Sequence, residues 1–244
     1  MPDRATHRSL SRAVYAGIRA DILAGRYAPG AKLSPRAIAT EYNVSLSVVR
    51  EALTRLTEQD LVVAAPQLGF SVVELDIDDV RDISRLRILI EGAGFREAIE
   101  HADVEYEAAV VASHHRLSRT PYVTGHPGET VTDEWARAHA EYHRALLSAC
   151  PSPRLRDLAA SLRDTAELFR RWSGSFDVNQ EPRDVPAEHR GLMEATLDHD
   201  ADRAVGLLTE HINKTAAVLE LYLDSGARSP ALGLTAPDAG PAAS

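Results

Sequence analysis

The chain has 244 residues, of which 44% are hydrophobic and 26% charged, proportions that are ordinary for a globular protein of one large or two smaller domains. Its single cysteine excludes an internal disulfide framework, and it contains neither a long apolar run nor a signal-peptide core. We therefore expect a cytoplasmic protein without a membrane partner. The net charge is −9, yet residues 1–75 carry nine Lys/Arg and seven Asp/Glu, so a slightly basic head precedes an acidic body. This distribution suits a small nucleic-acid-binding module joined to a second domain.

The first elements expected along the chain are two helices joined by a turn. Apolar residues recur at helical spacing over 13–23, and Pro29-Gly30 then turns the chain. Ser34 followed by Pro35 predicts the N-cap and first position of a short second helix. Residues 1–9 are polar, and we expect them to be mobile.

A third helix and a hairpin complete the N-terminal region. Ser45 predicts the N-cap of the third helix, whose inward face is Val49, Ala52, Leu53 and Leu56. Two β-rich runs, 61–65 and 70–73, flank a turn at 66–69 and predict a β-hairpin. Three helices followed by a hairpin within about 60 residues is the order of a winged helix-turn-helix.

From residue 76 onward the sequence predicts only helices. The expected helical segments are 77–101, 104–118, 131–150, 153–173, 184–199 and 201–224. About six helices of these lengths form a bundle with its own core. The predicted fold is therefore mainly α, with a DNA-binding domain over 1–75, a ligand-binding bundle over 76–224 and a low-complexity, disordered tail over 225–244.

One series of residues in this N-terminal motif is specific in its order and spacing, namely Tyr15, Ile18, Ile22-Leu23, Gly25, Pro29-Gly30, Leu33, Ala39, Val44-Ser45, Val49-Arg50-Glu51-Ala52-Leu53, Leu56, Leu61-Val62 and Gly69. With this series the motif resembles the GntR family of winged-helix regulators. The C-terminal part resembles the FCD ligand-binding domain of the fatty-acid-regulator-like branch. Together the two resemblances cover nearly the whole chain and imply an effector-responsive transcription regulator.

The resemblance makes the helix that follows Ser45 the recognition helix, whose N-terminal residues enter the major groove. The expected DNA-contacting residues are Arg36, Ser45, Leu46, Ser47, Arg50 and Arg55, with Gln67 and Gly69 in the hairpin turn. Family members usually read Ser-Arg-Thr-Pro/Thr-Val-Arg where residues 45–50 read Ser-Leu-Ser-Val-Val-Arg. Because Leu46 replaces an arginine that the family aims at DNA, we expect a different operator. A single winged helix reads few bases, so we also expect a homodimer on a palindromic double-stranded site.

Four of the ten histidines fall on faces that we expect to point into the bundle. His139 and His143 are spaced i, i+4 on one helix, while His189 and His211 lie on the apolar stripes of two later helices. Histidines on the inward faces of three helices can converge, and imidazole nitrogens suit zinc, nickel, iron or copper. The alternative is that each is a core residue satisfied by hydrogen bonds.

The resemblance adds a ligand pattern to these histidines. FCD domains that bind metal usually show Asp-x-x-Phe/Tyr-His, then Glu-His-Arg, then Glu-His-Ile on the last helix. Here residues 139–143 read His-Ala-Glu-Tyr-His, 188–190 read Glu-His-Arg and 210–212 read Glu-His-Ile, so His139 stands where the family has an aspartate. The resemblance therefore implies a divalent transition metal on all four histidines, zinc before nickel, iron or manganese.

Arg87 occupies an inward position on the first helix of the bundle and matches an inward arginine of the family. A buried guanidinium needs an anionic partner. That partner is either Glu91, four residues later, or a carboxylate of a small effector shared with the metal; the sequence leaves both open.

The function expected is an effector-controlled, DNA-binding regulator and not an enzyme. One alternative is a metalloenzyme with a DNA-binding appendage, although the chain lacks the repeated Glu-x-x-His of di-iron bundles and any nucleotide-binding glycine motif. Another is a regulator whose metal is purely structural, which a closed four-histidine site would favour.

Overall fold

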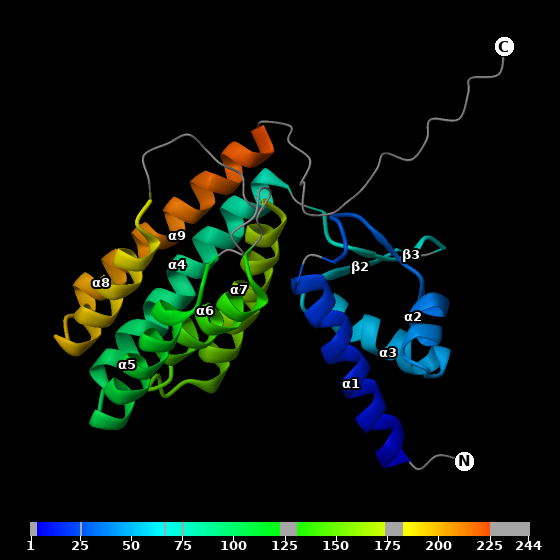
Figure 1. The fold of residues 1–244 in the computed structure, drawn as a ribbon, viewed down its shortest axis with the longest axis horizontal. Helices are drawn as coiled ribbons and strands as arrows, with labels where there is room; N and C mark the ends of the chain where they lie inside the picture. Colours follow the sequence, from blue (N-terminus) through cyan, green and yellow to red (C-terminus); the bar gives the residue numbers. More distant parts are fainter. Residues whose placement is uncertain are drawn as a thin grey trace.

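The structure is a computed structural model that describes residues 4–24, 26–65, 67–74, 76–122, 131–173 and 183–224. Within these ranges three helices and a small sheet form a winged-helix unit, and six further helices form a bundle (Figure 1). The predicted mainly α fold class is therefore confirmed. Residues 225–244, expected to be a disordered tail, lie outside the described residues. None of the described helices combines the length and the apolar character that crossing a membrane requires.

The winged-helix unit contains three helices and three strands. They are α1 (Arg4–Leu23), β1 (Lys32–Leu33), α2 (Pro35–Glu41), α3 (Leu46–Thr57), β2 (Val62–Ala65) and β3 (Gly69–Val72). The antiparallel sheet has the order β1-β3-β2, with Leu33 opposite Phe70 and Val63 opposite Ser71. The hairpin was expected, whereas β1 was not, because a two-residue strand has no periodicity of its own. It exists through its pairing with β3.

One helix start and one capping hydrogen bond differ from expectation. Helix α1 begins at Arg4, so residues 4–9 are helical rather than mobile as the sequence had suggested, and no glycine or proline interrupts them. Ser34 caps α2 as predicted, its hydroxyl accepting from the Ala37 amide. Ser45 occupies the N-cap position of α3, but its hydroxyl lies 2.9 Å from that of Ser47 and accepts no backbone hydrogen bond.

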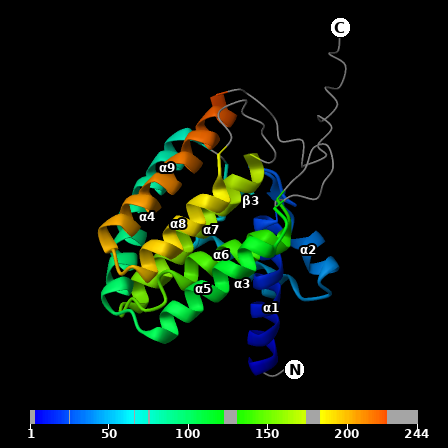
Figure 2. The same ribbon diagram turned by 60° about the vertical axis from the view of Figure 1, so that its left-hand side comes forward.

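The bundle consists of the six helices that the sequence predicts. They are α4 (Ile77–Glu100), α5 (Val104–Arg119), α6 (Asp133–Ala145), α7 (Pro153–Ser173), α8 (Val185–Leu197) and α9 (Ala201–Asp224). Helix α4 packs against both α9 and α7, and α8 lies along α9 (Figure 2). Asp76, Asp103, Thr132 and Asp184 cap four of these helices by accepting backbone N–H bonds. Helix α6 ends at Ala145, five residues before the predicted end, because the chain turns ahead of Pro151.

The apolar core falls into two clusters, and one of them crosses between the winged-helix unit and the bundle. The core around α1 and α3 also contains Leu168 and Phe169 of α7, Leu219 of α9 and Val80 of α4. Leu168 and Phe169 are almost completely buried. The bundle therefore contributes side chains to the hydrophobic core of the winged-helix unit, and α7 connects the two.

Candidate metal centre and its cavity

The four predicted histidines meet inside the bundle. Helix α6 supplies His139 and His143, α8 supplies His189 and α9 supplies His211. One ligand nitrogen from each can be chosen so that all four lie within 4.8 Å of one another. Nitrogens bound to one tetrahedral zinc lie about 3.3 Å apart. We call this group the histidine cluster, and its spacing is close to what one ion requires.

Burial keeps these imidazoles neutral. His143, His189 and His211 are only 1%, 2% and 5% exposed. Burial is the main cause that lowers the pKa of each cluster histidine, and the neighbouring imidazoles and arginines lower most of these pKa values further. A neutral imidazole keeps a lone pair for a metal, as ligation requires.

Three ring nitrogens of the cluster lack hydrogen-bond partners among the described residues. They are both nitrogens of His143 and Nε2 of His189. Leaving a buried polar atom unsatisfied costs about 1–3 kcal/mol. Core histidines satisfied by hydrogen bonds, the alternative reading of the sequence, would not leave these atoms unpaired. The residues present fit a transition metal.

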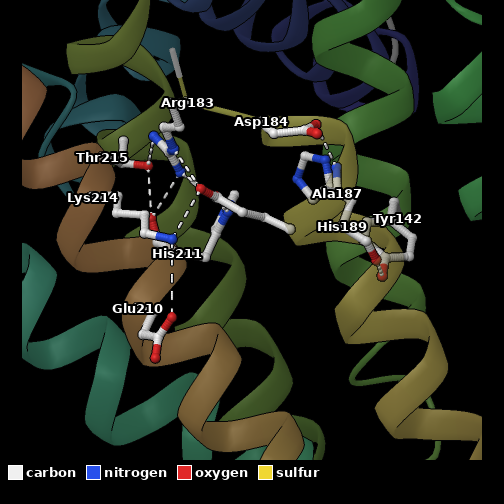
Figure 3. Close-up of polar contacts among 10 residues, drawn as sticks. Tyr142, Arg183, Asp184, Ala187, His189, Glu210, His211, Lys214 and Thr215 are labelled. Carbon is white, nitrogen blue, oxygen red and sulfur yellow. Dashed lines mark hydrogen bonds and ion pairs between the residues drawn. The ribbon is translucent and has the colours of Figure 1, made fainter. Parts of the chain in front are cut away.

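A carboxylate behind His211 sets which nitrogen of that ring faces the cluster (Figure 3). Nδ1 of His211 lies 2.8 Å from Glu188, and Arg183 donates two hydrogen bonds to the same carboxylate at 2.9 and 2.7 Å. Although burial raises the pKa of Glu188, the hydrogen bonds from His211 and Arg183 outweigh it and hold the pKa far below its ordinary value. An ionised Glu188 accepts from Nδ1–H of His211, which leaves Nε2 as the ligand atom.

Figure 3 also shows how α6 is held against α8. The hydroxyl of Tyr142 donates to the carbonyl oxygen of His189 at 2.7 Å, between the two helices that carry three of the four histidines. Tyr142 is fully buried. This contact fixes the relative position of the ligands before any ion arrives, which is the preorganisation that a metal site needs.

Glu91, one of the two partners expected for Arg87, contacts it in the structure. Nε of Arg87 donates to Glu91 at 2.6 Å, and Arg163 of α7 donates to the other oxygen of Glu91 at 3.1 Å. Glu91 is completely buried, so two arginines share one carboxylate. Arg163 was missed from the sequence, because only the packing of α7 on α4 brings it to Glu91. Two guanidinium groups and one carboxylate leave one positive charge in excess.

That excess charge faces a cavity of about 540 Å³. The cavity reaches the cluster, since His139, His143 and His211 line it. Its wall contains eight arginines and four acidic residues, namely Arg19, Arg26, Arg87, Arg137, Arg144, Arg163, Arg170 and Arg183 with Asp133, Glu141, Asp164 and Glu167. The volume suits a small organic ligand, and the charge favours an anion.

The residues predicted to contact DNA come from α2, α3 and the hairpin, and none of them is among the described residues that line the cavity. Arg36, Ser45, Leu46, Ser47 and Arg50 are all exposed around the N-terminus of α3. Their exposure leaves them available to a duplex. Arg55 is exposed as well, and its guanidinium lies 4.4 Å from the ring centre of Tyr15 on α1.

The turn of the hairpin forms the wing. Gln67 and Gly69 have positive φ values of 65° and 86°, the backbone conformation that reverses the chain here. Both are exposed, and Leu68 between them is the most exposed large hydrophobic residue of the winged-helix unit. The described wing places no basic side chain at its tip.

Comparison with known protein families matches both parts of the chain. Residues 10–72 match the family described as bacterial regulatory proteins, gntR family, and residues 82–214 match the FCD domain. The HTH-type transcriptional regulator BphR of Paraburkholderia xenovorans is 35% identical over 215 residues, which are 88% of this chain and 87% of BphR. The HTH-type transcriptional repressor GlaR of Escherichia coli is 29% identical, covering 81% of this chain and 90% of GlaR.

Solved structures share the fold. E. coli McbR/YncC superposes with a TM-score of 0.69 at 19% identity, covering 88% of this chain and 98% of that one. A GntR-type regulator from Rhodococcus sp. RHA1 superposes with a TM-score of 0.67 at 23% identity, covering 87% and 98%. The chain belongs to the GntR family of DNA-binding transcription regulators, with an FCD effector-binding domain after its winged helix, and is not an enzyme.

Proposed function

We propose that operator binding by this regulator is controlled by a carboxylate-bearing effector that binds at a metal ion held by His139, His143, His189 and His211. The observation that carries the proposal is the position of the histidine cluster at the wall of a cationic cavity. A bound divalent ion supplies a Lewis-acidic anchor for a carboxylate oxygen. The four-nitrogen donor set favours zinc, with nickel, iron and manganese as the other ions to test.

Arg87 and Arg163 hold the second side of the effector site. Both line the cavity and share Glu91, so one guanidinium charge stays uncompensated by that carboxylate. A carboxylate of the effector can accept hydrogen bonds from these guanidinium groups, which are always charged. Glu91 and an effector carboxylate, the two partners expected for Arg87, can then bind it together. Glu91 positions the guanidinium, and the effector carboxylate accepts a hydrogen bond from it.

A purely structural metal is the competing function. Such sites are closed, with every coordination position filled by protein. Three of the four cluster histidines instead line a cavity large enough for a ligand, which favours an exchangeable position. The test is a small-molecule screen by thermal shift on zinc-loaded protein. A carboxylate should raise Tm in zinc-loaded protein and not after chelation, and it should change operator affinity; no response from any carboxylate contradicts the proposal.

We propose that residues 1–75 bind DNA through the N-terminus of α3 and the wing, and that residues 76–224 sense the effector. Arg36, Ser45, Leu46, Ser47 and Arg50 lie on the surface offered to the major groove, with Gln67 and Gly69 of the wing beside the backbone. The stacking of Arg55 on Tyr15 leaves only its outer edge for a phosphate. At the position where the family has an arginine, Leu46 places an apolar side chain that can contact the methyl group of a thymine.

Replacing Arg50 by alanine is expected to weaken operator binding by about 1–3 kcal/mol, because Arg50 is an exposed cation on the helix proposed to read bases. The operator is first selected from a random DNA pool with the wild-type protein, and affinity is measured by fluorescence anisotropy at fixed salt. Arg119→Ala removes an exposed arginine in the last turn of α5 and serves as the control. Equal affinities for Arg50→Ala and wild type, with the fold intact, would remove Arg50 from the DNA surface.

The regulator is proposed to act as a homodimer on a palindromic site, with the bundle supplying most of the interface. Leu86 and Leu89 are exposed on α4 and offer an apolar face for a second copy. Light scattering should give twice the chain mass at micromolar concentration, and Leu89→Glu should shift the protein towards monomer. A stable wild-type monomer, both free and on DNA, would contradict the proposal.

A further inference from the structure

The cavity beside the histidine cluster is not confined to the bundle. Its wall includes Arg19, Ala20, Leu23, Ala24 and Arg26, all from or just after α1 of the winged-helix unit. Figure 1 shows the C-terminal end of α1 next to the bundle, where α1 contacts α7. A molecule that fills this cavity therefore touches the DNA-binding domain as well as the sensor.

Arginines from both parts of the molecule line this cavity. Arg87 of α4, Arg144 of α6 and Arg163 of α7 come from the bundle, and Arg19 comes from α1. The same wall contains three histidines of the cluster and the apolar residues Ala20, Leu23 and Ala160. The cavity therefore presents positive charge from the DNA-binding domain as well as from the bundle.

Arg19 has an ion-pair partner across the domain boundary. Its guanidinium donates to Asp164 of α7, and both side chains are 28% exposed. Asp164 directly follows Arg163, which holds Glu91. Leu168 and Phe169, on the next turn of α7, are buried in the core of the winged-helix unit. One helix therefore carries the wall of the effector cavity, the ion pair to α1 and the apolar contact to the DNA-binding domain.

We propose that Arg19 is an effector-binding residue supplied by the DNA-binding domain, and that the effector carries two anionic groups, of which the second takes Arg19 from Asp164. The inference rests on the proposed function, since it assumes the first carboxylate at the cluster with Arg87 and Arg163. An anion beside Arg19 competes with Asp164 for one guanidinium. The ion pair between α1 and α7 then opens when the effector binds, which gives the effector different contacts in the two arrangements of the domains, as an allosteric response requires.

The test uses full-length, zinc-loaded protein and three dicarboxylates of increasing length, succinate, adipate and suberate, measured by isothermal titration calorimetry. Arg19→Gln should weaken the tightest-binding of these about tenfold or more, because a charge-assisted hydrogen bond is lost. Asp164→Asn should tighten the same compound about twofold to fivefold, because the competing carboxylate is gone. The control Arg81→Gln breaks the Arg81–Glu220 pair away from the cavity and should leave binding within a factor of two.

Opposite effects of the two substitutions separate ligand contact from a structural role, since simple loss of the interdomain pair would shift binding in the same direction in both variants. Circular dichroism and Tm confirm that each variant is folded. If wild type binds a dicarboxylate and Arg19→Gln binds it equally well, or if both variants shift binding in one direction, this inference is overturned and the proposed function stands. If wild type binds none of the three, this inference is overturned, and the carboxylate screen on zinc-loaded protein decides the proposed function separately.

Discussion

Replacing His189 by alanine is expected to abolish stoichiometric metal binding and to lower the Tm of the metal-loaded protein by roughly 5–11 °C. The magnitude follows from linkage, because a ligand at about 100 times its Kd stabilises the folded state by about 2.7 kcal/mol, and a chain of this size shifts by about 2–4 °C per kcal/mol. His189 is 2% exposed and its Nε2 has no hydrogen-bond partner among the described residues. His189 should therefore stabilise the folded protein mainly by binding the metal ion.

The measurement is differential scanning fluorimetry with equimolar zinc and after chelation. The difference in Tm between wild type and His189→Ala should largely disappear when the metal is removed. His115→Ala, which removes an exposed histidine of α5, should behave like wild type in both conditions. A His189→Ala protein that keeps its full metal content would exclude His189 from the site, and an equal Tm difference with and without chelator would assign it a packing role only.

Replacing Glu91 by alanine is expected to destabilise the protein by about 3–5 kcal/mol, because it leaves Arg87 and Arg163 without the buried carboxylate that they share. Glu91 is fully buried and Arg87 is 7% exposed, so water in the cavity replaces only part of the lost interaction. The free energy of unfolding is measured by urea denaturation in metal-free protein, which separates this effect from that of the ion.

An ion pair on the surface of the same domain provides the comparison. Glu220→Ala breaks the pair with Arg81, whose side chain is 56% exposed, and should cost at most about 1 kcal/mol. Replacing Glu91, Arg87 and Arg163 together by methionine should recover much of the loss, because no buried charge then remains unpaired. A cost below about 1 kcal/mol for Glu91→Ala would show that the three groups are solvated in solution.

The elements with strong local signals were predicted well. The helical spacing of apolar residues predicted six bundle helices whose bounds in the structure agree to within five residues, and Ser34 caps α2 as expected. The convergence of the four histidines was also predicted, since each lies on the apolar stripe of its own helix. In a helical bundle, the side chains on the inward face of each helix pack into one shared core.

The features that depend on packing between distant segments were not predictable in this way. Strand β1 is too short to have a pattern and needs β3 beside it. Arg163 and Asp164 lie on an ordinary charged stretch of sequence, and only the position of α7 between α4 and α1 gives each a partner. The core that α7 shares with the winged-helix unit is likewise a property of how the two parts dock, which periodicity within one helix does not encode.

The metal content of the wild-type protein tests the central claim most directly. The protein is purified without a histidine tag and without chelator, and bound metals are measured by elemental analysis before and after incubation with zinc, nickel or manganese and removal of free ion. The histidine cluster predicts close to one ion per chain. A content near zero that does not rise with any of the three ions would contradict the account and leave the cluster as buried core.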